Sequence, residues 1–273
     1  MPEFVKVPVE EGFAWYLYGI VLCGENDRDI DTDLTGISAE PGVRIIVSGS
    51  LGAVVSRVPL SQFGAAVLEE KLQDLRWLEE KVRLHQELLQ QIMQEQTIIP
   101  MKFGTIFQSQ ERVRDILEEQ QEHFQALLKF LTGHEEWGVK GYYRREELHE
   151  YLKSGECSPK PGQGGTGLGK AYLLRKKLEE ELESRAVDYS RQIGEEAYGW
   201  LRVHSVRSTL NKFLSRNVTG REEELFFNGA FLVAKGSHGA FRHTVEKFNG
   251  EFGAQGIFLE VSGPWPPYSF VGE

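Results

Sequence analysis

Short runs of β-branched and aromatic residues alternate with long amphipathic stretches along this chain, and their order restricts the fold. Residues 15–22 (WYLYGIVL) lie between glycines and are typical of a buried strand. Residues 43–48 and 53–58 flank a Gly/Ser turn, so they predict a β-hairpin. An acidic loop, residues 24–42, joins the first strand to this hairpin, and we expect it to hold at most a short helix around 33–39.

The hydrophobic period changes after the hairpin. Apolar residues recur at three- and four-residue intervals from 63 to 92, as one face of a long helix requires, and Ser61 is its candidate N-cap. Residues 97–107 (TIIPMKFGTIF) return to strand composition, and Pro100 predicts an edge position or a bulge. The order strand, short helix, hairpin, long helix, strand is a ferredoxin-like plan, which predicts an N-terminal domain over 1–108.

The second half predicts another α+β unit with additional helices, over 109–273. Its expected helices are 109–131, 144–153, 171–214 and 239–248, and its expected strands are 137–143, 225–234 and 256–261. Leu174, Leu178 and Leu182 form an apolar stripe that should face a core. The expected fold class is therefore α+β in two domains, without a sequence repeat between them.

The Gly- and Pro-rich segment 154–169 contains a motif that resembles a phosphate-binding loop. The run from Gly164 to Lys170 (GGTGLGK) fits G-x-x-x-x-G-K, whose backbone N–H groups cradle phosphates. Ala171 stands where a Ser or Thr would bind magnesium, and the residues before the motif cannot form a strand. We therefore predict an exposed flexible loop. The alternative function is a nucleotide-dependent assembly ATPase, which Lys170→Ala would inactivate.

Little in the sequence supports a metal or catalytic centre. The histidines are scattered without H-E-x-x-H spacing, and a calcium-like loop that begins at Asp31 has Gly42 where a bidentate Glu is needed. Cys23 and Cys157 are too few for a four-thiolate zinc site, and no G-x-S-x-G elbow occurs. We predict that the protein is not an enzyme and has no catalytic residue, metal or cofactor.

Charge and hydropathy disfavour two further classes of function. The 273 residues carry 31 Lys and Arg against 41 Asp and Glu, a net charge of −10, which disfavours nucleic-acid binding. No apolar run approaches the roughly 18–20 residues of a membrane span, and the N-terminus does not resemble a signal peptide. We therefore expect a soluble cytoplasmic protein.

The C-terminal residues 263–270 (GPWPPYSF) combine three prolines with three aromatics. Prolines fix an extended backbone at low ordering cost, and Trp265, Tyr268 and Phe270 can each bury a large area. Such a segment either straps down its own domain or anchors a partner. We favour the intramolecular strap, because unsupported aromatics promote aggregation.

Several motifs together resemble the gas-vesicle protein F/L family. They are WYLYGIVL (15–22), LGAVVSRV (51–58), Trp77 with His85, IIPMKFGTIF (98–107), EEWGVK (135–140), AYLLRK (171–176), AFLV (230–233) and GPWPPYSF (263–270). They occur in family order over nearly the whole chain, and the combination of IIPMKFGT, EEWGVK and GPWPPYSF is specific. The glycine-rich insertion before Ala171 departs from the commoner family pattern, and the motifs do not separate F-type from L-type members.

The resemblance implies a non-enzymatic accessory protein of gas vesicles, the buoyancy organelles, with ferredoxin-like variants in two α+β domains. It implies binding of the major shell protein and of other accessory proteins during nucleation and assembly. A regulator that binds these proteins without entering the vesicle is a further alternative. The candidate docking residues lie in the 97–107 strand and in the tail: Ile98, Ile99, Pro100, Phe103, Trp265, Tyr268 and Phe270.

Overall fold

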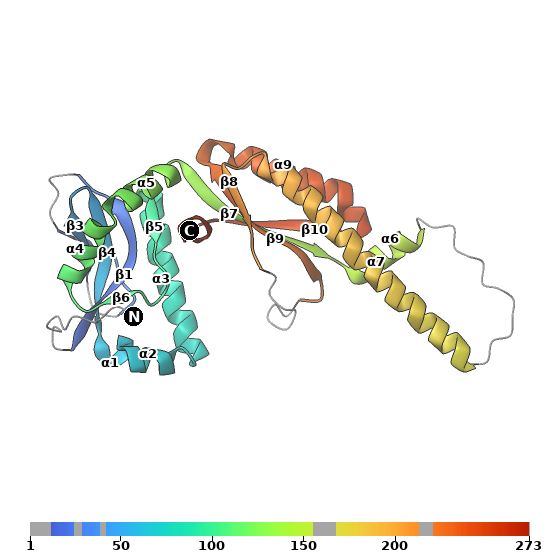
Figure 1. The fold of residues 1–273 in the computed structure, drawn as a ribbon, viewed down its shortest axis with the longest axis horizontal. Coiled ribbons are helices and arrows are strands. Elements are labelled where there is room, and N and C mark those ends of the chain that lie inside the picture. The colour runs from blue at the N-terminus through green and yellow to red at the C-terminus, as the bar shows by residue number, and fades with distance from the viewer. Residues whose placement is uncertain (1–11, 25–28, 39–41, 155–167, 213–220, 273) are drawn as a thin grey trace. The chain divides into compact units, whose positions relative to one another are not determined.

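The chain forms two compact units in a computed structural model that describes residues 12–24, 29–38, 42–154, 168–212 and 221–272 (Figure 1). The first unit contains Met1–His134 together with Trp265–Glu273, and the second contains Glu135–Pro264. The division thus falls between His134 and Glu135, later than the boundary expected after residue 108. The reason is that two helices after residue 108 pack on the first sheet.

The sheet of the first unit has the strand order of a split βαβ fold. Its strands are β1 (Phe13–Leu22), β2 (Ile30–Asp31), β3 (Val43–Ser48), β4 (Leu51–Pro59), β5 (Ile98–Pro100) and β6 (Ile106–Phe107). The order is β2-β3-β4-β1-β5, and β6 pairs with β1 beside β5. Because β4 lies between β1 and β3, the four main strands follow the ferredoxin-like plan that the sequence predicts.

The segment between β1 and β3 contains no helix within its described residues 29–38. For these residues the prediction of a short helix around 33–39 is therefore wrong. The hydroxyl of Thr32 donates to the carbonyl of Val43 at 2.6 Å and accepts from the N–H of Leu34 at 3.3 Å. Such side-chain bonds to the backbone compete with helix formation. The segment instead buries Ile37, which is 0% exposed, in the core of the first unit.

The long helix expected after the hairpin is divided into α1 (Leu60–Phe63), α2 (Ala65–Lys71) and α3 (Leu75–Glu95). Gly64 is extended, with ψ at 146°, and Asp74 starts α3 by accepting from the N–H groups of Arg76 and Trp77. Ser61 therefore lies inside α1, and the capping role falls to Asp74.

Two further helices complete the first unit. They are α4 (Gln110–Glu119) and α5 (Gln121–Leu131), which replace the single helix expected over 109–131. Ser109 caps α4, since its hydroxyl accepts from the N–H of Arg112 at 3.3 Å. Gln120 separates the two helices, with φ at −117° and ψ at 21°.

The second unit repeats the same strand order around a different core. Its elements are β7 (His134–Tyr143), α6 (Arg145–Ser154), α7 (Leu168–Arg202), β8 (Arg207–Leu210), β9 (Glu224–Ala234), α9 (His238–Phe252) and β10 (Ile257–Trp265). The sheet order is β10-β7-β9-β8. The order β10-β7-β9-β8 corresponds to β5-β1-β4-β3 in the first unit. In both sheets the fourth main strand of the unit lies beside the first, followed by the third and the second. Strand β8 is missing from the sequence prediction, which extends the preceding helix to 214.

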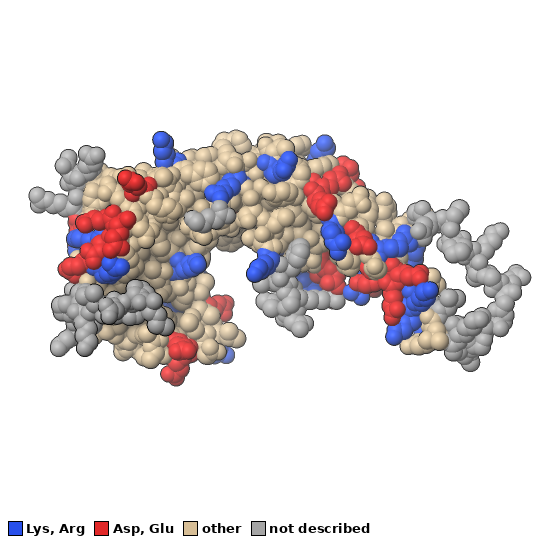
Figure 2. Space-filling model, in the orientation of Figure 1, with Lys and Arg blue, Asp and Glu red and all other residues tan. Residues whose placement is uncertain are grey.

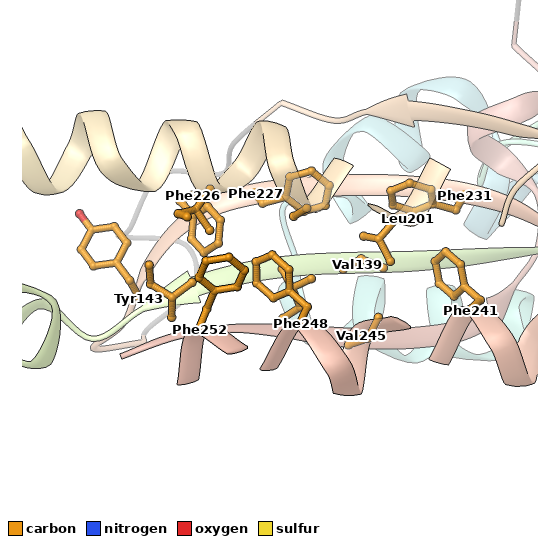
Figure 3. Close-up of a cluster of buried hydrophobic side chains, with 14 of the residues drawn as sticks. Val139, Tyr143, Leu201, Phe226, Phe227, Phe231, Phe241, Val245, Phe248 and Phe252 are labelled. Atoms are coloured by element: carbon orange, nitrogen blue, oxygen red, sulfur yellow. The ribbon is translucent and has the colours of Figure 1, made fainter. Parts of the chain in front are cut away.

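Aromatic and branched aliphatic side chains fill the core of the second unit. In Figure 3, Phe241, Phe248 and Phe252 of α9 point towards the phenylalanines of β9. Phe231 of β9 and Phe241 are both 0% exposed, and their ring centroids lie 5.4 Å apart. Since packing density and apolar burial dominate such a core, it is held by non-directional interactions.

Helix α7 is continuous over its 35 residues and passes Gly194 without a break. Its apolar face meets the core only from Leu182 onward, because Leu182 is 8% exposed whereas Leu178 is 55% exposed. The predicted stripe therefore faces a core at one end only, and the side chain of Leu174 lies outside the described residues. Within the described residues, none of the helices is long and apolar enough for a membrane span.

Candidate functional site

Most of the seven predicted docking residues lie in or against the core of the first unit. Ile98, Ile99 and Phe270 are at most 4% exposed, and Pro100 is buried at the end of β5, the outermost strand on that side of the sheet. Pro100 thus has the edge position that its sequence context predicts. Burial leaves these four side chains little surface that a partner could contact.

The other three predicted residues differ in exposure. Phe103 and Tyr268 are half-buried and pack against the same cluster as Ile98, so the structure brings residues 97–107 and the tail together. The single strand expected over 97–107 is divided into β5 and β6, and Phe103 lies in the turn between them. Trp265 remains 41% exposed at the end of β10. Among the seven residues, Trp265 presents the largest accessible aromatic surface, and the docking role of the set stays a prediction.

The C-terminal tail is a strap on the first unit. Its last turn, Tyr268–Phe270, belongs with Met1–His134 rather than with the unit from which the chain has just emerged. The hydroxyl of Tyr268 lies 2.8 Å from Nε2 of His85, which stands on the buried face of α3. The tail therefore closes the core of the N-terminal unit.

A buried chain of hydrogen bonds holds this strap. The N–H of Gly104 donates to the hydroxyl of Tyr16 at 3.1 Å, and that hydroxyl lies 3.0 Å from Nδ1 of His85. Every bond is satisfied when Tyr16 donates to Nδ1 and Nε2–H of His85 donates to the hydroxyl of Tyr268. The imidazole therefore acts as a neutral link between the first strand and the last turn.

Burial sets the protonation state of each group in this chain. Desolvation lowers the pKa of His85 to about 4 and raises the pKa of Tyr268 to about 12. It also raises the pKa of Tyr16 well above its usual value. Neutral phenols and a neutral imidazole are suited to structural hydrogen bonds rather than to the roles of a nucleophile and its base. We call the hydrogen-bonded set Tyr16, His85 and Tyr268 the latch.

A second buried hydroxyl pair anchors the non-helical connection. The hydroxyl of Tyr18 accepts from the N–H of Ile37 at 2.6 Å and lies 2.8 Å from Oγ of Ser56. Desolvation raises the pKa of Tyr18 to about 12. The connection therefore needs no helix to be fixed, because Tyr18 binds its backbone directly.

An open groove of about 640 Å³ lies in the second unit between α7 and the β8–β9 hairpin. Tyr143, Val187, Tyr198, Leu210 and Phe226 supply its apolar lining. Val187 and Leu210 are 41% and 59% exposed, so part of this lining is accessible to solvent. An apolar groove of this size fits a protein segment or a small ligand.

Charged side chains lie at one end of the groove. Glu183 of α7 and Glu224 of β9 both pair with Arg145 of α6, at 3.1 Å each. The single positive charge of Arg145 offsets only one of these two negative charges, which lie beside the apolar lining. The groove thus combines its apolar lining with charged residues, which also include Arg191 and Glu195.

Strand β8 forms one wall of the groove and one edge of the sheet. Within the part of the chain that the structure describes, its ladder partner is β9, with Leu210 opposite Gly229. Val206, directly before β8, is 53% exposed. A strand edge with exposed apolar side chains is a template for strand addition. Its sequence signal is weak, since the strand has only four residues (RSTL) and Leu210 is the one apolar residue among them.

The glycine-rich motif has no described geometry. Most of the expected flexible loop 154–169, including Gly164, lies outside the described residues. Its described ends are helical, because Ser154 ends α6 and Leu168–Lys170 form the first residues of α7. Within the described parts of the chain, no group of three or more His, Cys, Asp or Glu residues is placed to hold a metal ion.

Comparison with solved structures identifies the fold. The crystal structure of gas vesicle protein GvpF from Anabaena sp. PCC7120 aligns with a TM-score of 0.67 at 17% identity, over 95% of this chain and 98% of that chain. The GvpF structure from Microcystis aeruginosa gives a TM-score of 0.65 at 18% identity, over 95% and 99% of the two chains. Both matches include the two α+β units.

Sequence comparison identifies the family. Gas vesicle protein L of Streptomyces sp. (strain CB03234) is 27% identical over 87% of this chain and 85% of its own length. Gas vesicle protein F1 of Halobacterium salinarum is 22% identical, over 94% and 92% of the two chains. The family model for gas vesicle synthesis protein GvpL/GvpF matches residues 14–272. This chain therefore belongs to the GvpL/GvpF family of gas vesicle synthesis proteins.

Proposed function

We propose that this gas vesicle accessory protein acts in the cytoplasm, where it binds the major shell protein and further accessory proteins during nucleation and assembly. The groove between α7 and the β8–β9 hairpin carries this proposal as the docking surface. It combines an apolar lining, solvent access and a strand edge in one place.

The chemistry of the partner supports this choice of surface. A shell subunit with an exposed apolar face aggregates unless another protein covers that face. Strand addition at β8 would supply backbone hydrogen bonds, while Val187 and Leu210 would bury part of the partner's apolar surface. Tyr198 and Phe226 in the lining are of the aromatic type that dominates binding energy in interfaces.

The first unit offers a less suitable surface. Its edge strand β5 has three buried residues, and the tail is engaged with His85. Opening either would break packing and hydrogen bonds that hold the unit together. Trp265 is a secondary contact that we propose for other accessory proteins, because its ring is partly exposed.

Co-expression with the major shell protein tests the proposal. The tagged full-length chain should retain the shell protein in a soluble complex, and Leu210→Asp should reduce retention at least about tenfold, because a carboxylate would be buried against apolar surface. Leu75→Asp is the matched control, since Leu75 is 77% exposed in the first unit and lies outside the groove.

The outcomes separate the parts of the proposal. Equal retention by Leu210→Asp and wild type would exclude the groove as the docking surface while leaving shell binding in place. Failure of the folded wild-type chain to retain any shell protein would overturn the shell-binding proposal itself. Circular dichroism of each variant would show that lost retention does not reflect unfolding.

A further inference from the structure

The first half of α7 is a helix without a covering element among the described residues. Side chains 172–173 and 175–181 are exposed, and Leu182 is the first buried one. Helix α6 contacts α7 at Glu183 and at Tyr189, which both follow Leu182. In Figure 1, α7 extends well past α6 within the second unit. Its first half therefore has a free surface.

One face of this free half continues the side of α7 that meets the core. Leu178 precedes Leu182 by four residues, so both point to the same side of the helix. Leu178 is 55% exposed because the core ends at Leu182. Leu173 is 65% exposed but points about 140° away from Leu178 at 3.6 residues per turn. Among the described side chains, the uncovered apolar position on this face is thus Leu178.

Charged residues of opposite sign precede and follow Leu178 in the sequence. Arg175, Lys176 and Lys177 precede it, and Glu179, Glu180 and Glu181 follow it. At about 100° per residue, Arg175 and Glu179 flank one side of the Leu178 face, while Lys177 and Glu181 flank the other. Lys176 and Glu180 point away from it. Both charge types gather together on this part of the surface in Figure 2.

This arrangement is self-complementary for one orientation of two helices. In an antiparallel pair with its two-fold axis at Leu178, Arg175 lies beside Glu179 of the second copy. Lys177 likewise lies beside Glu181 of the second copy, and the symmetry repeats both pairs. A parallel in-register pair would instead set Arg175 beside Lys177 and Glu179 beside Glu181, so like charges would repel.

We propose that the first halves of α7 from two copies of this chain pair antiparallel, centred on Leu178. The existing i,i+4 ion pairs leave these charges available, because Arg175–Glu179 and Lys177–Glu181 are long, at 3.8 and 3.7 Å, and exposed. Two helix segments of about three turns bury less than the roughly 1,200 Å² of a standard interface, so the dimer is weak and concentration-dependent.

Sedimentation equilibrium of the full chain over a range of concentrations tests this pairing. Wild type should show a monomer–dimer equilibrium that high salt weakens, since exposed charges are screened. The double variants R175E/K177E and E179K/E181K should each be monomeric, because all flanking charges then have one sign. Mixing the two should restore a dimer that contains one copy of each.

Matched variants on the same helix serve as controls. K176E/E180K reverses charges on the far side and should leave dimerisation unchanged. Leu178→Asp should abolish it, whereas Leu173→Asp, on the other side, should not. Circular dichroism should show equal helix content in all variants.

Three results would overturn the proposal. One is a wild type that stays monomeric at every concentration. Another is a dimer that persists in both charge variants, which would place the interface elsewhere. The third is a dimer that Leu178→Asp leaves intact, which would show that the Leu178 face does not form the interface.

Discussion

The two units share a strand order, yet different interactions hold their cores together. In the first unit, Tyr16, Tyr18 and His85 bring polar atoms into the core and satisfy them with short hydrogen bonds. In the second, phenylalanines from α9 and β9 fill the space between helices and sheet. The same topology is therefore compatible with an apolar core that contains a hydrogen-bonded network and with one that phenylalanines dominate.

This difference affects how each unit depends on the rest of the chain. The hydrogen-bonded network in the core of the first unit is completed by Tyr268, which lies 183 residues after His85 in sequence. Among the described residues, the apolar core of the second unit is formed by buried residues from 137 to 259, with Val261 packed against it. The first unit should therefore respond to pH and to changes at the C-terminus, and the second mainly to loss of volume.

The largest effect is expected from a cavity in the apolar core. Phe248→Ala should lower the free energy of unfolding of the second unit by about 3–5 kcal/mol, because Phe248 is 1% exposed and packs on Phe252 and Trp200. Chemical denaturation measures this loss of stability, and hydrogen exchange of the amides in β7 and β9 assigns it to the second unit. Leu75→Ala, at a residue 77% exposed, is the control and should change little; equal losses would contradict the assigned core.

Acid should destabilise the first unit through His85. Its pKa in the folded state, about 4, is lower than the unfolded value near 6.5. As pH falls, the imidazole of His85 therefore binds a proton in the unfolded chain before it does so in the folded one. The free energy of unfolding is highest above pH 6.5, and it should decrease by roughly 3 kcal/mol as pH falls towards 4. His85→Gln should flatten this dependence in hydrogen exchange of β1. An unchanged slope in the variant would show that another group is responsible.

Removing the hydroxyl of Tyr268 should have an intermediate effect on the stability of the first unit. Tyr268→Phe leaves Nε2 of His85 without its partner, which should cost about 1–2 kcal/mol of stability in the first unit. Tyr172→Phe, at a ring 58% exposed on α7, is the matched control and should be neutral. Proteolysis of the C-terminal segment would report its release, and equal protection in both variants would argue against the latch.

The smallest effect tests where the helix begins. Asp74→Ala should cost about 1 kcal/mol, because two N–H groups at the start of α3 lose their acceptor. Ser61→Ala should be close to neutral, since Ser61 lies inside α1. Thermal denaturation compares them. A larger loss at Ser61 would favour the undivided helix that the hydrophobic period alone predicts.

Long periodic segments explain why much of the fold is predictable. The strands at β1, β4, β7 and β9 have enough β-branched and aromatic residues to be located from sequence. The division near Gly64 and Asp74 is not visible in the hydrophobic period, because the apolar spacing continues across it. Strand β8 has four residues, and its pairing with β9 rather than its own composition makes it a strand.

The site is less predictable because it depends on contacts between distant segments. The aromatic tail predicts a strap, but nothing local in GPWPPYSF indicates that it closes the first unit through His85. A single histidine on a helix gives no sign that its two nitrogens meet Tyr16 and Tyr268. The groove likewise exists only because α7 crosses beside the β8–β9 hairpin.

The most direct measurement is retention of the major shell protein by the full-length chain, compared between Leu210→Asp and Leu75→Asp. The account predicts that wild type and Leu75→Asp retain the shell protein equally, while Leu210→Asp loses at least about nine-tenths of it. Equal retention by all three proteins would contradict the claim that the groove of the second unit is where the shell protein docks.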